Sequence, residues 1–218
     1  MRKRVVGLAV ALVVAGVASA GSGRPKHAYT AAGQALARSI VLHRSDLPAS
    51  FRSIPSSGNE GRLPSCKGFK PDQSDLTWRG KASAQFDVAG GPTLVSSDAD
   101  VWLSAAQARA AFDRVVRPGL SECLFTLFAA GLNAHAPKGV RYVPVSHSLK
   151  ALSGLGEQAA HVRLVFTGIS GSFHIRLVSD YYAIRKGRVT ALITTFDLRA
   201  PYALGPALAA KVASRMPS

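Results

Sequence analysis

The two cysteines constrain this chain more than any other feature of its sequence. Cys66 lies in a segment rich in serine, glycine and proline, and Cys123 lies in the longest helical pattern, Ser104 to Gly131. Two cysteines in an exported chain point to one disulfide, the alternative being two buried free thiols. The bond would close a loop of 57 positions, which stabilises a fold by about 4 kcal/mol in the chain-entropy model. We therefore expect the pair to tie the helical segment to the start of the folded domain.

The N-terminus has the pattern of a secretory signal peptide, residues 1 to 20. Basic residues at positions 2 to 4 precede an apolar run from Val5 to Ala18, and Ala18-Ser19-Ala20 fits the small-residue cleavage rule. The alternative is an uncleaved membrane anchor. The apolar stretch is shorter than the roughly 17 to 25 residues that a spanning helix needs. We expect cleavage near Ala20 and a location outside the cell or in the cell envelope, with no transmembrane segment afterwards.

The chain is strongly basic, with 27 lysine and arginine residues against 12 aspartate and glutamate residues and a formal charge of +15. Three basic residues leave with the signal peptide, so the charge falls only to +12. Such a charge favours anionic surfaces, namely nucleic acid, acidic wall polymers or anionic lipid headgroups. Export argues against nucleic acid. Solubility alone is the alternative explanation.

A single α+β domain is expected over residues 35 to 216, after a flexible tail of residues 21 to 34. Residues 31 to 42 already carry apolar positions at helical spacing. Leu47 and Phe51 flank the turn at Pro48 and are expected to insert into the core.

Alternating apolar positions predict strands in the rest of the domain. They cover residues 81–88, 93–103, 140–149, 160–166, 173–184 and 188–198. The short turns between them predict an antiparallel β-sheet of about five or six strands. The predicted helices are expected to pack on one face of this sheet.

Local signals divide the long helical segment in two. Ser104 followed by Gln107 forms a capping box, and Pro118 should break the run into two helices. Gly131 has the position of a C-terminal capping residue. A last helix is expected after Pro201, restarting at Gly205-Pro206, with Leu208 and Val212 toward the core.

The hairpin across Gly168 to Gly171 carries the most distinctive group of charges. Four cationic side chains share one expected face: His161, Arg163, His174 and Arg176. If Phe166 pairs with Phe173, the two arginines lie directly opposite each other, which destabilises a strand pair. Solvent and Asp180 could offset this repulsion. The functional hypothesis is that these four residues bind an anion.

Other chemistry has weaker support. Asp98 and Asp100 share a strand face beside Trp102, as paired carboxylates for glycoside hydrolysis would, although a solvated strand face has the same pattern. Ser170 is not in a nucleophile elbow, because the second glycine comes one residue early. No histidine stands at ligand spacing from either cysteine. We expect no catalytic residue, no metal and no cofactor.

Three segments in order suggest a family. They are SDLPASF (residues 45 to 51), VWLSAAQARAAF (101 to 112) and GLGEQA (154 to 159). Together they resemble the exported sensor-like domains of actinobacteria, which occur in envelope lipoproteins and in the extracellular parts of some mycobacterial receptor serine/threonine kinases. The resemblance covers about residues 35 to 216. It implies an antiparallel sheet with helices on one face, a cleft for an unidentified ligand, and no catalytic residues.

The chain departs from that family in several ways. Receptor-type members commonly have two disulfides, whereas two cysteines allow one. No kinase domain, transmembrane helix or lipid-attachment cysteine is expected, so sensing would need a separate membrane partner. The sequence thus predicts an exported, non-enzymatic ligand-binding or sensor-like module of the bacterial cell envelope. Its ligand is unknown, and an anion is the candidate. The alternatives are a secreted hydrolase that uses an acidic pair, and a structural protein that binds anionic wall polymer.

Overall fold

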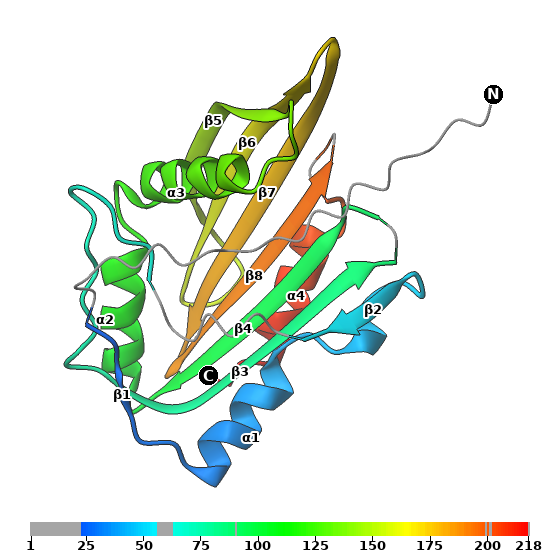
Figure 1. Cartoon of the computed structure of the whole chain (residues 1–218). Helices are drawn as coiled ribbons and strands as arrows, with labels where there is room; N and C mark the ends of the chain where they lie inside the picture. The colour runs from blue at the N-terminus through cyan, green and yellow to red at the C-terminus, as the bar shows by residue number, and fades with distance from the viewer. Residues whose placement is uncertain (1–22, 56–62, 90, 199, 201, 218) are drawn as a thin grey trace.

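The computed structural model describes residues 23–55, 63–89, 91–198, 200 and 202–217, so the expected signal peptide lies outside the described residues. In this described part, eight strands form one sheet in the order β1-β3-β4-β8-β7-β6-β5, with β2 also paired to β3 (Figure 1). The strands are β1 (Lys26–His27), β2 (Phe51–Ile54), β3 (Thr77–Val88), β4 (Leu94–Trp102), β5 (Arg141–Leu152), β6 (Gln158–Ser170), β7 (Phe173–Lys186) and β8 (Val189–Leu198).

The α+β class is confirmed, and every strand pair except β1–β3 is antiparallel. The expected number of five or six strands is too low, because β1 and β2 were not anticipated. Both are very short and pair with β3, far away in the sequence. Leu47 and Phe51 are buried, as expected.

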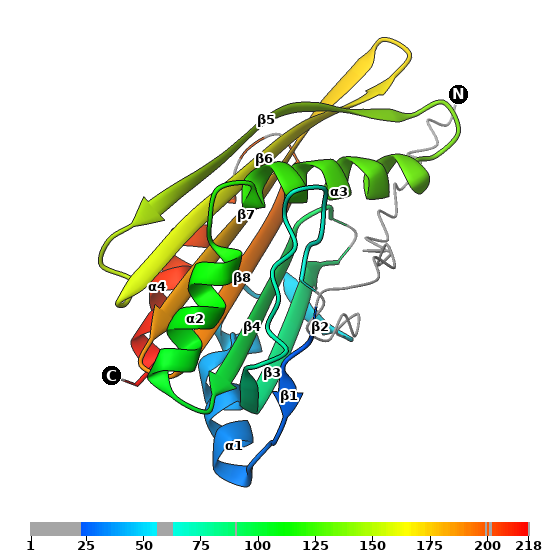
Figure 2. The same cartoon turned by 90° about the vertical axis from the view of Figure 1, so that its left-hand side faces the viewer.

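Helices cover both faces of the sheet, so the expectation of helices on one face is wrong (Figure 2). The helices are α1 (Ala31–Ile40), the short 3₁₀ helix η1 (Arg44–Asp46), α2 (Ala105–Val115), α3 (Leu120–Ala134) and α4 (Gly205–Arg215). One core cluster joins α1 and α4 to one face, and a second joins α3 to the other. A third surrounds Trp78 and Trp102 under α2.

The interior strand β7 shows why both faces of the sheet need a covering layer. Four consecutive residues, Leu177 to Asp180, are all buried, although neighbouring side chains in a strand point to opposite faces. A strand that is buried on both sides needs a covering layer on both sides.

The long helical segment breaks where the sequence predicts. Ser104 caps α2 by accepting a hydrogen bond from the Gln107 amide (3.2 Å). After α2, Pro118 and Gly119 turn the chain, and Gly119 has φ of +93°. The two helices meet at 64°. Gly131 does not end α3, as had been expected, but lies inside it.

No single helix in the described residues is long and apolar enough to cross a membrane. Only α2 and α3 taken together pass on length and composition, and they are bent at their junction.

The described part of the expected N-terminal tail belongs to the fold. Residues 26 and 27 pair with β3, and Thr30 caps α1 through a hydrogen bond to its hydroxyl from the Gly33 amide (3.0 Å). Gly33 and Gly80 then allow α1 to lie directly on β3. A methyl group at Gly80 would stand 2.1 Å from the Gly33 carbonyl oxygen.

This close approach gives a stability prediction. We expect Gly80→Ala to lower the free energy of unfolding by about 2 kcal/mol or more, because the methyl group can fit only if α1 moves off the sheet. The matched control is Gly131→Ala, where nothing lies within 4 Å of the added carbon. That change inside a helix should stabilise by up to about 1 kcal/mol. Urea denaturation measures both, and equal effects would contradict the packing described.

Candidate functional site

The segment that carries Cys66, residues 63 to 76, is anchored on the junction of α2 and α3; we call it the disulfide loop. Cys66 is bonded to Cys123 in the first turn of α3, with Cα atoms 5.6 Å apart. Phe69 is buried and lies against Gly119 between the two helices. The expected disulfide is thus present, and it holds the loop at the helix break.

Polar contacts attach the second half of the loop to α2. The Gln73 side chain is buried and donates a hydrogen bond to the Ala111 carbonyl oxygen (3.3 Å). Arg114 donates to the Asp72 carbonyl oxygen (2.9 Å) and makes a two-pronged ion pair with the Asp75 carboxylate. The loop is therefore held along its length by one covalent bond, one buried amide and one ion pair.

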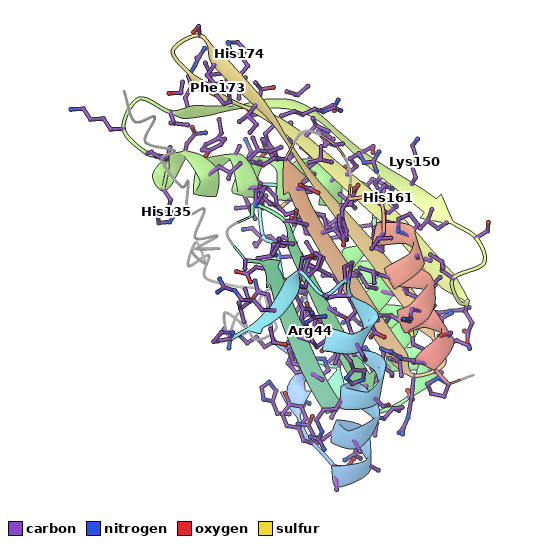
Figure 3. All side chains as sticks on the ribbon, turned by 90° about the vertical axis from the view of Figure 1, so that its right-hand side faces the viewer. Arg44, His135, Lys150, His161, Phe173 and His174 are labelled. Atoms are coloured by element: carbon purple, nitrogen blue, oxygen red, sulfur yellow. A yellow bond between two sulfur atoms is a disulfide. The ribbon has the colours of Figure 1, made fainter. Side chains whose placement is uncertain are left out.

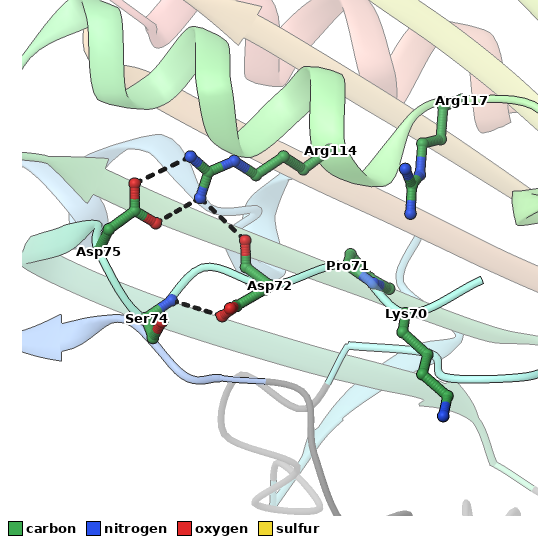
Figure 4. Close-up of a pocket in the computed structure, with 7 residues that line it drawn as sticks. All are labelled: Lys70, Pro71, Asp72, Ser74, Asp75, Arg114 and Arg117. Atoms are coloured by element: carbon green, nitrogen blue, oxygen red, sulfur yellow. Dashed lines mark hydrogen bonds and ion pairs between the residues drawn. The ribbon is translucent and has the colours of Figure 1, made fainter. Parts of the chain in front are cut away.

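A pocket of about 370 Å³ opens between the disulfide loop and the C-terminal end of α2. Figure 4 shows Arg114 joined to Asp75 and to the backbone of Asp72, with Arg117 and Lys70 at the side away from this pair. The lining residues are Lys70, Pro71, Asp72, Ser74, Asp75, Arg114 and Arg117. All but Pro71 are polar or charged, so the pocket suits a polar ligand.

The two carboxylates of the pocket are ionised near neutral pH. The Arg114 guanidinium lowers the pKa of Asp75 to about 2. A hydrogen bond from the Ser74 amide, 2.9 Å long, lowers the pKa of Asp72. Asp75 is paired with Arg114, so the two carboxylates compensate only part of the positive charge of the pocket. Two further cations line the pocket.

Those two cations are Lys70 and Arg117. Neither takes part in an ion pair within the described part of the chain. The Arg117 guanidinium carbon lies 5.2 Å from the centre of the Phe69 ring, a cation–π distance that fixes its position. With three cations against two carboxylates, the pocket has an excess of positive charge.

Sequence reasoning did not identify this pocket, although a signal was present. Lys67 and Lys70 closely follow Cys66, and Arg114 and Arg117 precede Cys123. A disulfide brings its flanking residues together, so cations beside both cysteines predict a local positive site.

The four residues expected to bind an anion do lie on one face, but in a different register. Phe166 pairs with Leu177, not with Phe173, so Arg163 stands opposite Asp180 and Arg176 opposite Thr167. The expected Arg163–Arg176 opposition is therefore wrong. The register is set by a hairpin turn that is tighter than assumed, with Ser170 paired to Phe173.

Asp180 gathers two of the four cations. Its carboxylate is 1% exposed and accepts hydrogen bonds from Arg163 (2.6 and 3.2 Å) and contacts the His161 ring nitrogen at 2.7 Å. Burial alone would raise the pKa of Asp180, but the bonds from His161 and Arg163 outweigh it and lower the pKa. His161 also stacks on Tyr182, with ring centres 4.7 Å apart.

The other two residues, His174 and Arg176, are exposed near the tip of the β6–β7 hairpin. Figure 3 shows His174 and Phe173 at this tip, well away from His161 and Lys150. The four residues that were expected to bind an anion together thus form two separate groups, one at Asp180 and one near the hairpin tip.

The two carboxylates of β4, Asp98 and Asp100, both bond to side chains of the neighbouring strand. Asp98 accepts a hydrogen bond from the Ser83 hydroxyl (2.5 Å), and Asp100 pairs with the Lys81 ammonium (3.0 Å). Burial raises the pKa of Asp98, although Ser83 and Lys81 oppose this. The two carboxylates therefore have different partners on β3.

Within the described ranges, no three histidine, cysteine, aspartate or glutamate side chains gather where a metal ion could bind. Ser170 lies at the exposed end of β6, in the hairpin turn.

Comparison with solved structures finds distant likenesses at the level of the fold. The crystal structure of the extracellular domain of PknH from Mycobacterium tuberculosis aligns with a TM-score of 0.46 and 11% sequence identity, covering 84% of this chain and 95% of that chain. This is a match at the level of the fold only. No protein-family model matches the chain, and a search of curated proteins found no match.

The Asp180 contacts give a pH-dependent prediction. We expect Asp180→Asn to lower the free energy of unfolding by about 2 kcal/mol near neutral pH, because the Arg163 guanidinium loses its buried carboxylate partner. Since folding lowers the pKa of Asp180, this stabilisation is complete above the ordinary carboxyl value of 3.8 and is lost as the pH falls through the folded value. The difference between wild type and variant should therefore shrink in strong acid.

The matched control is Asp87→Asn, which breaks an exposed pair with Arg52 (2.8 Å). Exposed pairs contribute about 1 kcal/mol or less. Urea denaturation near neutral pH and at about pH 2 measures both variants. If Asp180→Asn costs no more than Asp87→Asn at neutral pH, the network around Asp180 does not have the role described.

Proposed function

We propose that this protein is an exported, non-enzymatic ligand-binding module of the bacterial cell envelope, with a sensor-like role. Its ligand carries an anionic group that Lys70 and Arg117 hold in the pocket beside the disulfide loop. The observation that carries the proposal is the position of these two cations, which line a pocket without a carboxylate partner in the described residues.

The chemistry of the pocket favours a small polar ligand. Its volume of about 370 Å³ lies at the low end of the range of about 300 to 1,000 Å³ for ligand pockets, and those are mostly apolar. Arginine offers a planar pair of donors that matches carboxylate and phosphate groups. Asp72 and Asp75, kept ionised, can accept hydrogen bonds from hydroxyl or ammonium groups of the same ligand.

The disulfide supports both export and preorganisation. Such bonds persist in oxidising compartments outside the cytoplasm. Because Cys66–Cys123 and the Arg114–Asp75 pair already hold the loop, a ligand need not order it on binding, which reduces the entropic cost of association.

The alternatives have less support. A hydrolase would need Asp98 and Asp100 to act together on a substrate, but Asp100 is paired with Lys81 and Asp98 with Ser83. A purely structural wall-binding role would need no pocket. For transmission of a binding signal across a membrane, we propose a membrane-protein partner.

Inorganic phosphate provides a first probe of the pocket. At constant ionic strength, phosphate titrated into the isotope-labelled protein should shift the amide resonances of the disulfide loop and of the end of α2. Lys70→Ala/Arg117→Ala should weaken this binding at least about tenfold, which corresponds to the loss of roughly one charge-assisted hydrogen bond.

The matched control removes two exposed cations elsewhere, Arg38→Ala/Arg188→Ala, and so keeps the net charge of the test variant. The control should bind phosphate as wild type does. Equal weakening in both variants would show a nonspecific charge effect and would reject the pocket as the site.

A further inference from the structure

The second half of the chain contains a long region that is almost free of acidic residues. From Cys123 to Ser179 there are five lysine and arginine residues and one carboxylate, Glu157, a formal excess of four positive charges. This region forms most of α3, all of β5 and β6, and the first half of β7. This edge of the sheet therefore has a net positive charge with few carboxylates to offset it.

The register brings several of these cations together near the β6–β7 hairpin. Arg141 on β5 and His174 on β7 both pair with Ile169, which lies between them on β6. Two residues further along β7, Arg176 pairs with Thr167 of β6. All three side chains are exposed and form no ion pair in the described part of the chain. We call Arg141, His174, Arg176 and Phe173 the hairpin tip.

The hairpin tip projects from the body of the molecule (Figures 1 and 2). α1 and α4 pack on the other end of the sheet and leave this part of their face uncovered. The turn itself, Ser170 to Ser172, is made of small exposed residues. Among the described residues, no helix covers this face of the hairpin tip, so a flat surface can approach it.

An exposed aromatic ring completes the tip. Phe173 is 61% exposed, more than any other large apolar side chain in the described residues. Val145, on the edge strand β5, is 57% exposed. Single exposed apolar residues are ordinary on soluble proteins. Here, however, the ring stands at the end of a projecting hairpin. Strand alternation places it on the face opposite to His174 and Arg176, so the ring and the cations lie on the two sides of the same tip.

We propose that the hairpin tip docks the protein on an anionic lipid bilayer, with Phe173 in the headgroup region and Arg141 and Arg176 against lipid phosphates. Aromatic rings favour the boundary between headgroups and acyl chains. Basic residues close to an anionic membrane surface add attraction that salt weakens. An acidic wall polymer would satisfy the cations but would leave the exposed ring without a role, so the bilayer fits both observations.

His161, Arg163 and Lys150 lie on the same face farther from the tip. Asp180 already neutralises part of that group, so it contributes to the general positive field rather than to the contact. The tip shares no residue with the pocket beside the disulfide loop. Failure of either proposal would therefore leave the other unaffected.

The test uses protein purified after export, with its N-terminus verified by mass spectrometry. Vesicles of phosphatidylglycerol and phosphatidylcholine in equal parts are compared with phosphatidylcholine alone in a sedimentation assay. The protein should bind the anionic vesicles, and Arg141→Glu/Arg176→Glu should weaken binding at least about twentyfold. The matched control, Arg38→Glu/Arg188→Glu, makes the same change in net charge away from the tip and should retain most of the affinity.

Insertion of the ring has a separate readout. Phe173→Trp should be quenched by brominated acyl chains in anionic vesicles, whereas Leu103→Trp, at an exposed site outside the tip, should not. Native Trp78 and Trp102 are buried and supply a constant background. No vesicle binding, equal loss in both charge variants, or binding to a soluble anionic polymer with no quenching at Phe173→Trp would each overturn the proposal.

Discussion

The disulfide between Cys66 and Cys123 is the constraint on which the arrangement of the candidate site depends. It joins a loop with little secondary structure to the first turn of α3, next to the break between α2 and α3. Around it, Phe69 fills the space beside Gly119. The same attachment positions the Arg117 guanidinium over the Phe69 ring. A bond that the sequence already implies thus organises a pocket that the sequence did not reveal.

Much of the fold could be predicted from the sequence because its signals are local. Alternating apolar residues predicted the six long strands, and Pro118 predicted the break between two helices. β2, only four residues long, could not be found, because its partner lies at the far end of β3. Helices on both faces were also missed. The clue was the run Leu177 to Asp180, in which a polar pair, Ser179 and Asp180, is buried among apolar neighbours.

Much less of the candidate site could be predicted, because the site depends on contacts between segments that are distant in the sequence. The cationic residues of β6 and β7 were correctly assigned to one face, because an error of four positions in register preserves strand alternation. The partners of these residues were not predicted. Asp180 pairs with Arg163 and contacts His161, so these two side chains are not free to bind an anion in the way expected. The two proposals therefore use cations whose partners are absent from the described residues, one set in the pocket and one at the hairpin tip.

The most direct test of this account is amide hydrogen exchange in Cys66→Ser/Cys123→Ser compared with the native protein. In the native protein the Phe69 amide donates to the Cys66 carbonyl oxygen (3.0 Å), and the Gln73 side chain holds the loop to α2. If the disulfide organises the loop, exchange at Phe69 should accelerate at least about tenfold in the variant, through local opening, while the paired amides of β6 and β7 keep their protection. Unchanged protection of the disulfide loop would contradict the central claim.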